Sequence, residues 1–248
     1  MPINMTSGLK AVFFDAGETL LAPHPSHHEL FALVLSEHGH QVAPETVQSV
    51  FADMAPTFVA VMDRMAVKQW SISREASLEF WGRIYGEALE RLGVPDPGQS
   101  VFDSLYERFT RYDSYRLFPE CIPTLRAVKE AGLVVGLISN FEEWLEGMLI
   151  EMEIAHLFDI MVISGKEGIE KPDPAIFRLA LDRSGVDARH SIYVGDHPKL
   201  DVEAARAVGM DAVLIDRKGH HPEFAGDRID TLDGLLGLLD LGYLDNHA

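Results

Sequence analysis

The 248-residue sequence predicts an α/β fold, in which helices cover a parallel sheet and an all-helical domain is inserted after the first strand. The first observation is a series of short, nearly continuous apolar runs, the pattern of strands that are buried on both faces. The second is the alternation of such runs with helical periodicity from about residue 116 onward, which indicates βαβ units. The third is a long stretch, from residue 22 to about residue 114, with helical periodicity and no clear strand.

Three apolar runs are the clearest predicted strands, and a polar residue ends each of them. These runs are KAVFFD (10–15), GLVVGLIS (132–139) and IYVGD (192–196). Two weaker copies are FDIMVIS (158–164) and DAVLID (211–216). Apolar residues at helical spacing predict intervening helices at 119–132, 173–186 and 200–210. The Leu-rich stretch at 232–244 predicts a packed terminal helix.

The inserted stretch predicts a separate helical domain. Helical periodicity covers residues 27–40, 44–66, 73–93 and 99–112. The segment APHPSHH (22–28) marks the start of the insert, and YDSYRLFP (112–119) marks its end. We therefore expect a core domain of residues 1–22 and 115–248 and a helical domain of residues 23–114.

The composition argues against several classes of protein. Acidic residues outnumber basic ones by 39 to 21, and the net charge of −18 disfavours binding to nucleic acid or to an anionic membrane surface. No stretch approaches the length of a membrane span, and the N-terminal MPINMTSGLK lacks the apolar segment of a signal peptide. The single cysteine, Cys121, rules out a disulfide framework within the chain and is expected to be a buried packing residue. We expect a cytoplasmic protein that is a monomer or a homodimer.

Polar residues follow the three clearest strands where each strand ends: Asp15, Ser139 with Asn140, and Asp196. In a parallel sheet with crossover helices, ligands bind beyond the carboxyl ends of the strands. Each of these residues alone is an ordinary helix cap or turn residue. Because all of them follow strands of one predicted sheet, we expect them to share one edge of that sheet and to form a site.

The two carboxylates at this edge, Asp15 and Asp196, indicate metal-assisted phosphoryl chemistry. Like charges crowd unfavourably unless a cation or a proton joins them. Carboxylate, carbonyl and water oxygens suit Mg²⁺, which would also offset the acidic protein for a phosphate substrate. One carboxylate can attack phosphorus, while Ser139 and the Lys171 ammonium in EKPDP (170–174) can hold the phosphoryl oxygens.

Four segments, in this order, resemble the haloacid dehalogenase-like superfamily of hydrolases: FFDAGETL (13–20), LISN (137–140), KPDPAIF (171–177) and YVGDHPKLDVEAARAVGM (193–210). The last of them is the most specific. The resemblance covers about residues 10–22 and 115–240, and the helical insert has the placement of the family's helical cap. It implies a Rossmann-like core. It also implies hydrolysis of a small phosphorylated metabolite through an aspartyl-phosphate intermediate, with Mg²⁺ as cofactor.

The resemblance also assigns roles to individual residues. The implied catalytic and phosphate-binding residues are Asp15, Ser139, Asn140 and Lys171. The implied metal ligands are Asp15, the backbone carbonyl of Gly17, and Asp196. The implied supporting residues are Thr19 and Asp201. Gly17 can fill its role because a backbone carbonyl needs no side chain.

One position departs from the family pattern. Phosphatases of the family usually carry a second Asp two residues after the nucleophile, which protonates the leaving group and later activates water. Here that residue is Gly17. The loss of such a group costs about 10²–10⁴-fold in rate. Three explanations stay open: a good leaving group, as in an acyl or aryl phosphate; a substitute acid–base, Glu18 or His197; or a catalytically weak binding member of the fold.

A 2-haloacid dehalogenase is a further alternative, because family members of that type also lack the second Asp. Their fourth segment differs, however, from GDHPKLD (195–201), which is similar to that of the metal-dependent phosphatases. The sequence therefore favours a phosphatase, and halide release from a 2-haloacid is the observation that would reveal the alternative.

Overall fold

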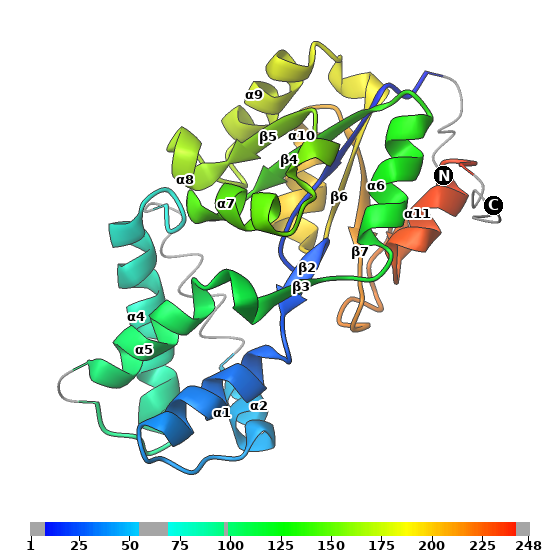
Figure 1. Cartoon of the computed structure of the whole chain (residues 1–248). Coiled ribbons are helices and arrows are strands. Elements are labelled where there is room, and N and C mark those ends of the chain that lie inside the picture. The colour runs from blue at the N-terminus through cyan, green and yellow to red at the C-terminus, as the bar shows by residue number, and fades with distance from the viewer. Residues whose placement is uncertain (1–7, 55–68, 97–98, 242–248) are drawn as a thin grey trace. The chain divides into compact units, whose positions relative to one another are not determined.

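The computed structural model describes residues 8–54, 69–96 and 99–241 (Figure 1). The chain divides into two compact units, one of Met1–Leu21 with Leu117–Ala248 and the other of Ala22–Arg116. The first is an α/β unit and the second consists mainly of helices. The division falls between Leu21 and Ala22 and between Arg116 and Leu117.

The α/β unit is built on a six-stranded parallel sheet with the order β5-β4-β1-β6-β7-β8. Its strands are β1 (Ala11–Phe14), β4 (Val134–Ser139), β5 (Ile160–Ile163), β6 (Ser191–Gly195), β7 (Asp211–Ile215) and β8 (Arg228–Ile229). The five predicted strands are all present, so the predicted α/β class is confirmed. The sixth, β8, has only 2 residues, too few to show a pattern in the sequence.

Strand β1 lies inside the sheet, with β4 on one side and β6 on the other. Its register sets Phe14 opposite Leu137 of β4 and opposite Val194 of β6. The backbone N–H of Asp15 continues this pairing by donating to the carbonyl of Val194 at 2.9 Å. The carboxyl ends of the three strands are therefore level, and the residues that follow them come together.

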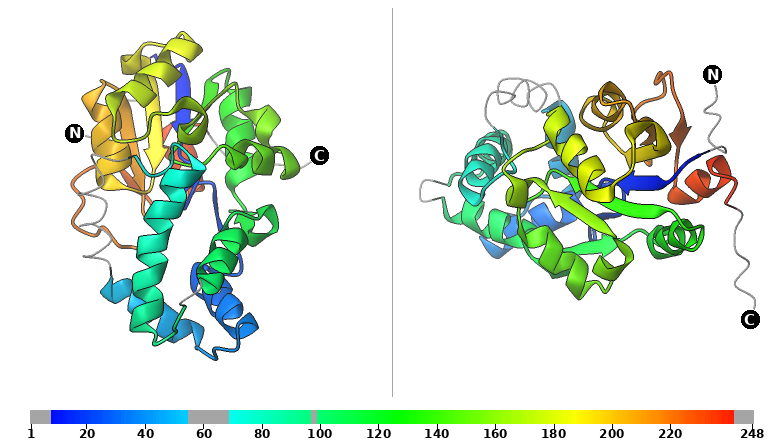
Figure 2. Two further views of the ribbon diagram at one scale, coloured as in Figure 1. Left: turned by 90° about the vertical axis from the view of Figure 1, so that its left-hand side faces the viewer. Right: turned by 90° about the horizontal axis from the view of Figure 1, so that it is seen from above.

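Helices cover both faces of this sheet, which explains why its strands are apolar on both sides. On one face lie α9 (Pro174–Ser184), the π-helical segment η4 (Pro198–Glu203) and α10 (Ala204–Ala207). On the opposite face α6 (Cys121–Glu130) packs against β4 and α11 (Leu232–Leu238) (Figure 2). The remaining helical segments of the unit are α7 (Trp144–Glu151), η2 (Ala155–Leu157), α8 (Ser164–Glu167) and η3 (Ala188–His190).

The cluster beneath α9 and α10 shows how the sheet anchors the site. Phe13, Ile138 and Tyr193 are fully buried there together with Phe177 of α9. The residues at or just beyond the ends of these strands are thereby fixed on rigid elements, because a close-packed interior allows few alternative side-chain positions. As expected, Cys121 is buried at the start of α6.

The helical unit contains α1 (His27–Glu37), α2 (Pro44–Asp53), α4 (Arg74–Arg91), α5 (Ser100–Phe109) and the 3₁₀ turn η1 (Tyr112–Ser114). Serine side chains begin two of the helices: Ser26 accepts from the N–H of Glu29, and Ser73 accepts from the N–H of Ala76, both at 3.2 Å. The predicted helix at 44–66 begins as expected, and its part from residue 55 lies outside the described residues.

Two short strands that the sequence did not predict, β2 (Leu21–Pro23) and β3 (Tyr115–Leu117), pair with each other where the chain passes between the units. Each has only 3 residues, too few for an alternating pattern to be visible. Over residues 8–54, 69–96 and 99–241, no helix has both the length and the apolar character needed to cross a bilayer.

Candidate active site

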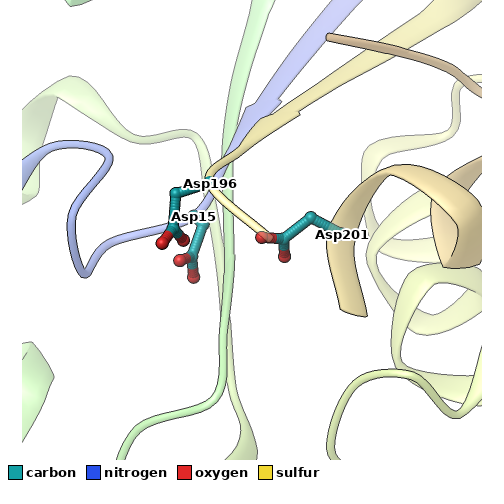
Figure 3. Close-up of side chains that lie close together, drawn as sticks. All are labelled: Asp15, Asp196 and Asp201. Carbon is teal, nitrogen blue, oxygen red and sulfur yellow. The ribbon is translucent and has the colours of Figure 1, made fainter. Parts of the chain in front are cut away.

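Carboxylates meet at the carboxyl edge of the sheet, as the strand order predicts. Oxygen atoms of Asp15, Asp196 and Asp201 all lie within 4.8 Å of one another. Asp15 follows β1, Asp196 follows the neighbouring β6, and Asp201 comes from η4. Figure 3 shows the carboxyl groups of Asp15 and Asp196 side by side, with Asp201 pointing toward them. Residues that are remote in sequence thus form one cluster.

The ammonium group of Lys171 binds two of the three carboxylates of this cluster. Its ammonium donates to Asp15 Oδ1 at 2.8 Å and to Asp201 Oδ1 at 2.6 Å. A third bond, of 3.0 Å, joins it to the hydroxyl of Tyr193. The Lys171 side chain is only 3% exposed, so both ion pairs are shielded from water. The hydroxyl of Ser139 also donates to Asp15 Oδ1, at 2.8 Å.

Asp201 is held on both of its oxygens. Besides Lys171, Oδ1 accepts from the Tyr193 hydroxyl at 3.2 Å, and Oδ2 accepts from the backbone N–H of His197 at 2.8 Å. A Cβ at position 195 would collide with this carboxylate, so only Gly195 allows Asp201 to approach the end of β6 so closely. Asp201 therefore supports the site by fixing Lys171 and the backbone that follows Asp196.

Asn140, which the resemblance implies to be a phosphate-binding residue, contacts the backbone of Lys171. Its side-chain amide donates to the carbonyl of Lys171 at 2.8 Å, and its Oδ1 accepts from the N–H of Lys171 at 2.7 Å. The Asn140 amide thus binds both the N–H and the carbonyl of Lys171. The side chain therefore positions Lys171, and the binding of phosphate by Asn140 stays a prediction.

The charges of the cluster do not balance within the protein. Burial lowers the pKa of Lys171, but the carboxylates of Asp15 and Asp201 outweigh it, so this pKa is raised and the ammonium stays charged. Burial raises the pKa of Asp15 against the effect of Lys171. Desolvation, followed by the charges of Asp201 and Asp15, raises the pKa of Asp196 well above its ordinary value. One ammonium is too little positive charge for three carboxylates.

This imbalance suits a divalent cation with oxygen ligands. Among the described residues, the Asp196 carboxylate has no hydrogen bond or ion pair, and Asp15 Oδ2 likewise accepts no hydrogen bond there. These oxygens are therefore free to take ligand positions. Carboxylate oxygens are the donors that Mg²⁺ prefers in proteins.

The turn after Asp15 carries Gly17, and neither its backbone nor its surroundings require a glycine there. Gly17 is not among the residues with positive φ, and an added Cβ would lie at an ordinary 3.7 Å from Phe141 Cε2. The neighbouring Glu18 does take the left-handed region, with φ of 53°. Thr19 is fully buried, and its hydroxyl has no hydrogen-bond partner within the described part of the chain.

The two candidate substitutes for an acid–base group are engaged elsewhere. The Glu18 carboxylate forms an ion pair of 2.8 Å with Lys218. The imidazole Nδ1 of His197 accepts from the N–H groups of Lys199 and Leu200, both at 3.2 Å, and so caps η4. No hydrogen bond from either side chain to Asp15 is found across the described residues.

The sequence patterns do not predict the contacts of two residues in this region, Tyr193 and Arg217. The apolar pattern predicts Tyr193 only as part of a buried strand, although its hydroxyl binds Lys171, Asp201 and, at 2.7 Å, the carbonyl of Ile138. Arg217 lies just beyond β7 and bonds to the backbone of the turn after Asp15. The available signals were a polar hydroxyl inside a buried strand and a cation two residues after the end of a strand.

Comparison with known proteins places this geometry in a family. A family model described as haloacid dehalogenase-like hydrolase matches residues 9–209. Haloacid dehalogenase-like hydrolase domain-containing protein 3 of Danio rerio is 30% identical over 217 residues, which cover 84% of this chain and 85% of that protein. Phosphoserine phosphatase of Thermus thermophilus is 37% identical over 146 residues, which cover 58% of this chain and 57% of that protein.

The fold is also that of solved structures. The HAD-hydrolase YfnB from Bacillus subtilis matches with a TM-score of 0.73 and 14% identity, covering 94% of this chain and 99% of that one. At this identity the likeness shows the fold alone. The family model, by contrast, spans most of the sequence, including the first three segments that carry the resemblance and the fourth as far as Gly209. The chain therefore belongs to the haloacid dehalogenase-like hydrolases.

Proposed function

We propose that the protein is a Mg²⁺-dependent phosphatase that acts on a small phosphorylated metabolite, with Asp15 as the nucleophile. One observation carries the proposal: Oδ1 of Asp15 is held by Ser139 and Lys171, and its Oδ2 makes no hydrogen bond among the described residues. A carboxylate fixed in this way is oriented, and its two oxygens can divide the two tasks of attacking phosphorus and binding the ion. The similarity to a phosphoserine phosphatase supports the same reaction class.

The chain's own residues account for the two steps of the reaction. In the first, an oxygen of Asp15 forms a bond to phosphorus while the bond to the leaving group breaks, which gives an aspartyl phosphate. In the second, water attacks phosphorus and releases phosphate and Asp15. Lys171 and Ser139 lie within hydrogen-bond distance of Asp15 Oδ1, and donors that now bind Asp15 can turn to the phosphoryl oxygens as charge develops.

The residues that would hold Mg²⁺ are Asp15, Asp196 and the backbone carbonyl of Gly17. When bound, the ion supplies positive charge that offsets both the carboxylates and the phosphoryl group. Asp201 and Asn140 act one step away, because their contacts hold Lys171 in place.

Gly17 narrows the choice of substrate. Glu18 and His197 are both engaged outside the Asp15 network, which favours the explanation that the leaving group needs little protonation. An acyl phosphate or an aryl phosphate has such a leaving group. Hydrolysis of alkyl phosphates should then be slower, by up to about 10²–10⁴-fold. This is the contribution that acid–base catalysis usually makes to the rate.

The test is a panel of acyl, aryl and alkyl phosphates, with and without Mg²⁺, on the wild-type protein and on Asp15→Asn. We expect Mg²⁺-dependent release of phosphate, and a loss of more than about 10³-fold in the variant. Asp187→Asn makes the same chemical change at an exposed ion pair with Arg189 and serves as the control. Substantial phosphatase activity in Asp15→Asn would contradict the proposal.

The same Gly17 supports a second candidate, a 2-haloacid dehalogenase, in which Asp15 would displace halide without a metal. Halide release from a 2-haloacid with no need for Mg²⁺ would establish it. Tight binding of a panel member without turnover, at high protein concentration, would instead indicate a binding protein with this fold.

A further inference from the structure

Arg217 uses all three guanidinium nitrogens and the face of the guanidinium group in contacts close to the candidate active site. Its Nε donates to the carbonyl of Glu18 at 3.1 Å, and its Nη2 donates to the carbonyl of Thr19 at 2.7 Å. Its Nη1 forms an ion pair of 2.6 Å with the carboxylate of Glu120. The guanidinium also lies over the ring of Phe118, 3.5 Å from its centroid. All of these partners belong to the α/β unit.

These contacts join three segments that are distant in the sequence. They are the turn that follows Asp15, the stretch 118–120 by which the chain returns to the sheet, and the end of β7. The side chains of Arg217 and Glu120 are only 11% and 12% exposed, so water competes weakly for this ion pair. Burial opposes ionisation of Glu120, but bonds from its own backbone and from Arg217 lower its pKa, so the pair stays charged.

The turn itself needs an external support. Glu18, a residue with a Cβ, takes the left-handed conformation, which is unfavourable without compensating contacts. Within the turn, the N–H of Glu18 bonds to the carbonyl of Leu21 and the N–H of Leu20 bonds to that of Ala16, both at 2.8 Å. The carbonyls of Glu18 and Thr19 both accept from Arg217.

We propose that Arg217 is a positioning residue for hydrolysis: it clamps the turn at residues 17–19, directly after Asp15, and so fixes the backbone carbonyl of Gly17 for its role as a ligand of the ion. The part that concerns the metal rests on the proposed function. Lysine cannot replace arginine here, because two carbonyls and one carboxylate need the planar fork of the guanidinium. The nearby Lys218 contacts Glu18 through an exposed ion pair and cannot hold the backbone in the same way.

The test compares Arg217→Lys and Arg217→Met with the wild-type protein. The first measurement is amide hydrogen exchange in metal-free protein, where we expect the N–H groups of Glu18 and Leu20 to exchange about 10-fold faster in both variants. Sheet amides such as that of Phe13 should keep their rates. The matched control is Arg183→Lys, which removes a two-pronged bond to Glu167 elsewhere in the same unit and should leave all three amides unchanged.

The second measurement is calorimetric titration with Mg²⁺, followed by turnover of the substrate found in the phosphate panel. We expect Arg217→Lys to weaken Mg²⁺ binding about 10-fold and to lower kcat by a similar factor with little change in KM. Unchanged exchange at Glu18 and Leu20 would overturn the proposal, as would an equal acceleration across the sheet.

The two proposals fail in different ways. If the wild-type protein shows no phosphatase activity but exchange at the turn still accelerates in the variants, the clamp stands and the proposed function falls. If phosphatase activity is present and Arg217→Lys matches the wild type in exchange, metal affinity and kcat, the clamp alone is refuted.

Discussion

The two units of the chain differ in what they bury. Among the described residues, every buried charged side chain belongs to the α/β unit: Asp15, Glu170, Lys171, Asp201 and Asp216. The described buried residues of the helical unit are apolar or aromatic, apart from Ser71, Ser77 and Ser114. A buried charge is costly unless it is paired and hydrogen-bonded. At the ends of the strands, oppositely charged partners come together and offset the cost of burial. The same place is where chemistry can occur.

Ion pairs show the same contrast. In the helical unit, Arg83–Glu79 and Arg91–Glu87 lie one helical turn apart on α4, with side chains at least 32% exposed. Pairs of this kind contribute little to stability. The Lys171 side chain, at 3% exposed, carries two pairs whose loss would leave carboxylates buried beside one another. The helical unit thus depends on packing, and the sheet edge depends on a balance of charges.

Among the substitutions that test this comparison of the two units, the largest effect is expected from removing Lys171. Lys171→Met should lower phosphatase activity by about 10²–10³-fold, because a donor to the reacting group is lost. It should also destabilise the fold by about 3–5 kcal/mol, since breaking a buried pair leaves an uncompensated charge. Steady-state kinetics and urea denaturation measure the two effects.

Lys166→Met is the matched control, because Lys166 forms an exposed pair of 2.6 Å with Glu146 in the same unit. The change should cost less than about 1 kcal/mol. Equal destabilisation by the two substitutions would remove the distinction between buried and exposed pairs on which the comparison of regions is based.

Gly17→Asp should raise activity. The Cβ position at residue 17 has ordinary contacts, so an aspartate can be accommodated there. We expect alkyl phosphates to be hydrolysed about 10²-fold faster, the lower end of the contribution of a general acid–base, with little gain on aryl phosphates. The measurement is the slope of log kcat against the pKa of the leaving group, which should become shallower.

Gly17→Asn, which adds nearly the same volume without an acid, is the control and should leave the slope unchanged. A steep slope retained in Gly17→Asp, with intact folding by circular dichroism, would show that proton transfer at this position does not limit the rate.

Asp196→Asn should alter the response to Mg²⁺ and to pH. Because the folded-state pKa of Asp196 is raised above its ordinary value of 3.8, the folded protein holds a proton that the unfolded chain releases. The free energy of unfolding of the metal-free protein should therefore fall as pH rises above 3.8 and toward the raised pKa. At pH 8 the metal-free variant should be the more stable protein.

Mg²⁺ at about 100 times its dissociation constant should stabilise the wild-type protein by about 2.7 kcal/mol. This corresponds to a rise of about 5–10 °C in Tm for a protein of this size. Asp196→Asn should show little of this rise, whereas Asp187→Asn should show all of it. A rise that is the same in all three proteins would place the ion elsewhere.

The difference between the units also explains what the sequence could reveal. Asp15, Ser139 and Asp196 were predictable because each ends a continuous apolar run, and parallel strands bring such ends to one edge. The contact between Asn140 and Lys171 was not predictable, because it depends on the distance between the Asn140 side chain and the backbone of Lys171, 31 residues away. The role of Arg217 was still harder to predict, because Arg217 binds the carbonyl of Glu18, a residue 199 positions away in the sequence.

The smallest effect should come from trimming one methyl group in each unit. Ile84→Val in α4 and Ile138→Val in β4 both alter fully or almost fully buried side chains, and each should cost about 0.5–1.5 kcal/mol. Only Ile138→Val should also lower kcat for a small aryl phosphate, by a few-fold, because Ile138 packs in the same cluster as Tyr193 and directly precedes Ser139. If Ile84→Val lowered kcat and Ile138→Val did not, packing in the helical unit would govern the chemical step, and the assignment of catalysis to the sheet edge would have to be revised.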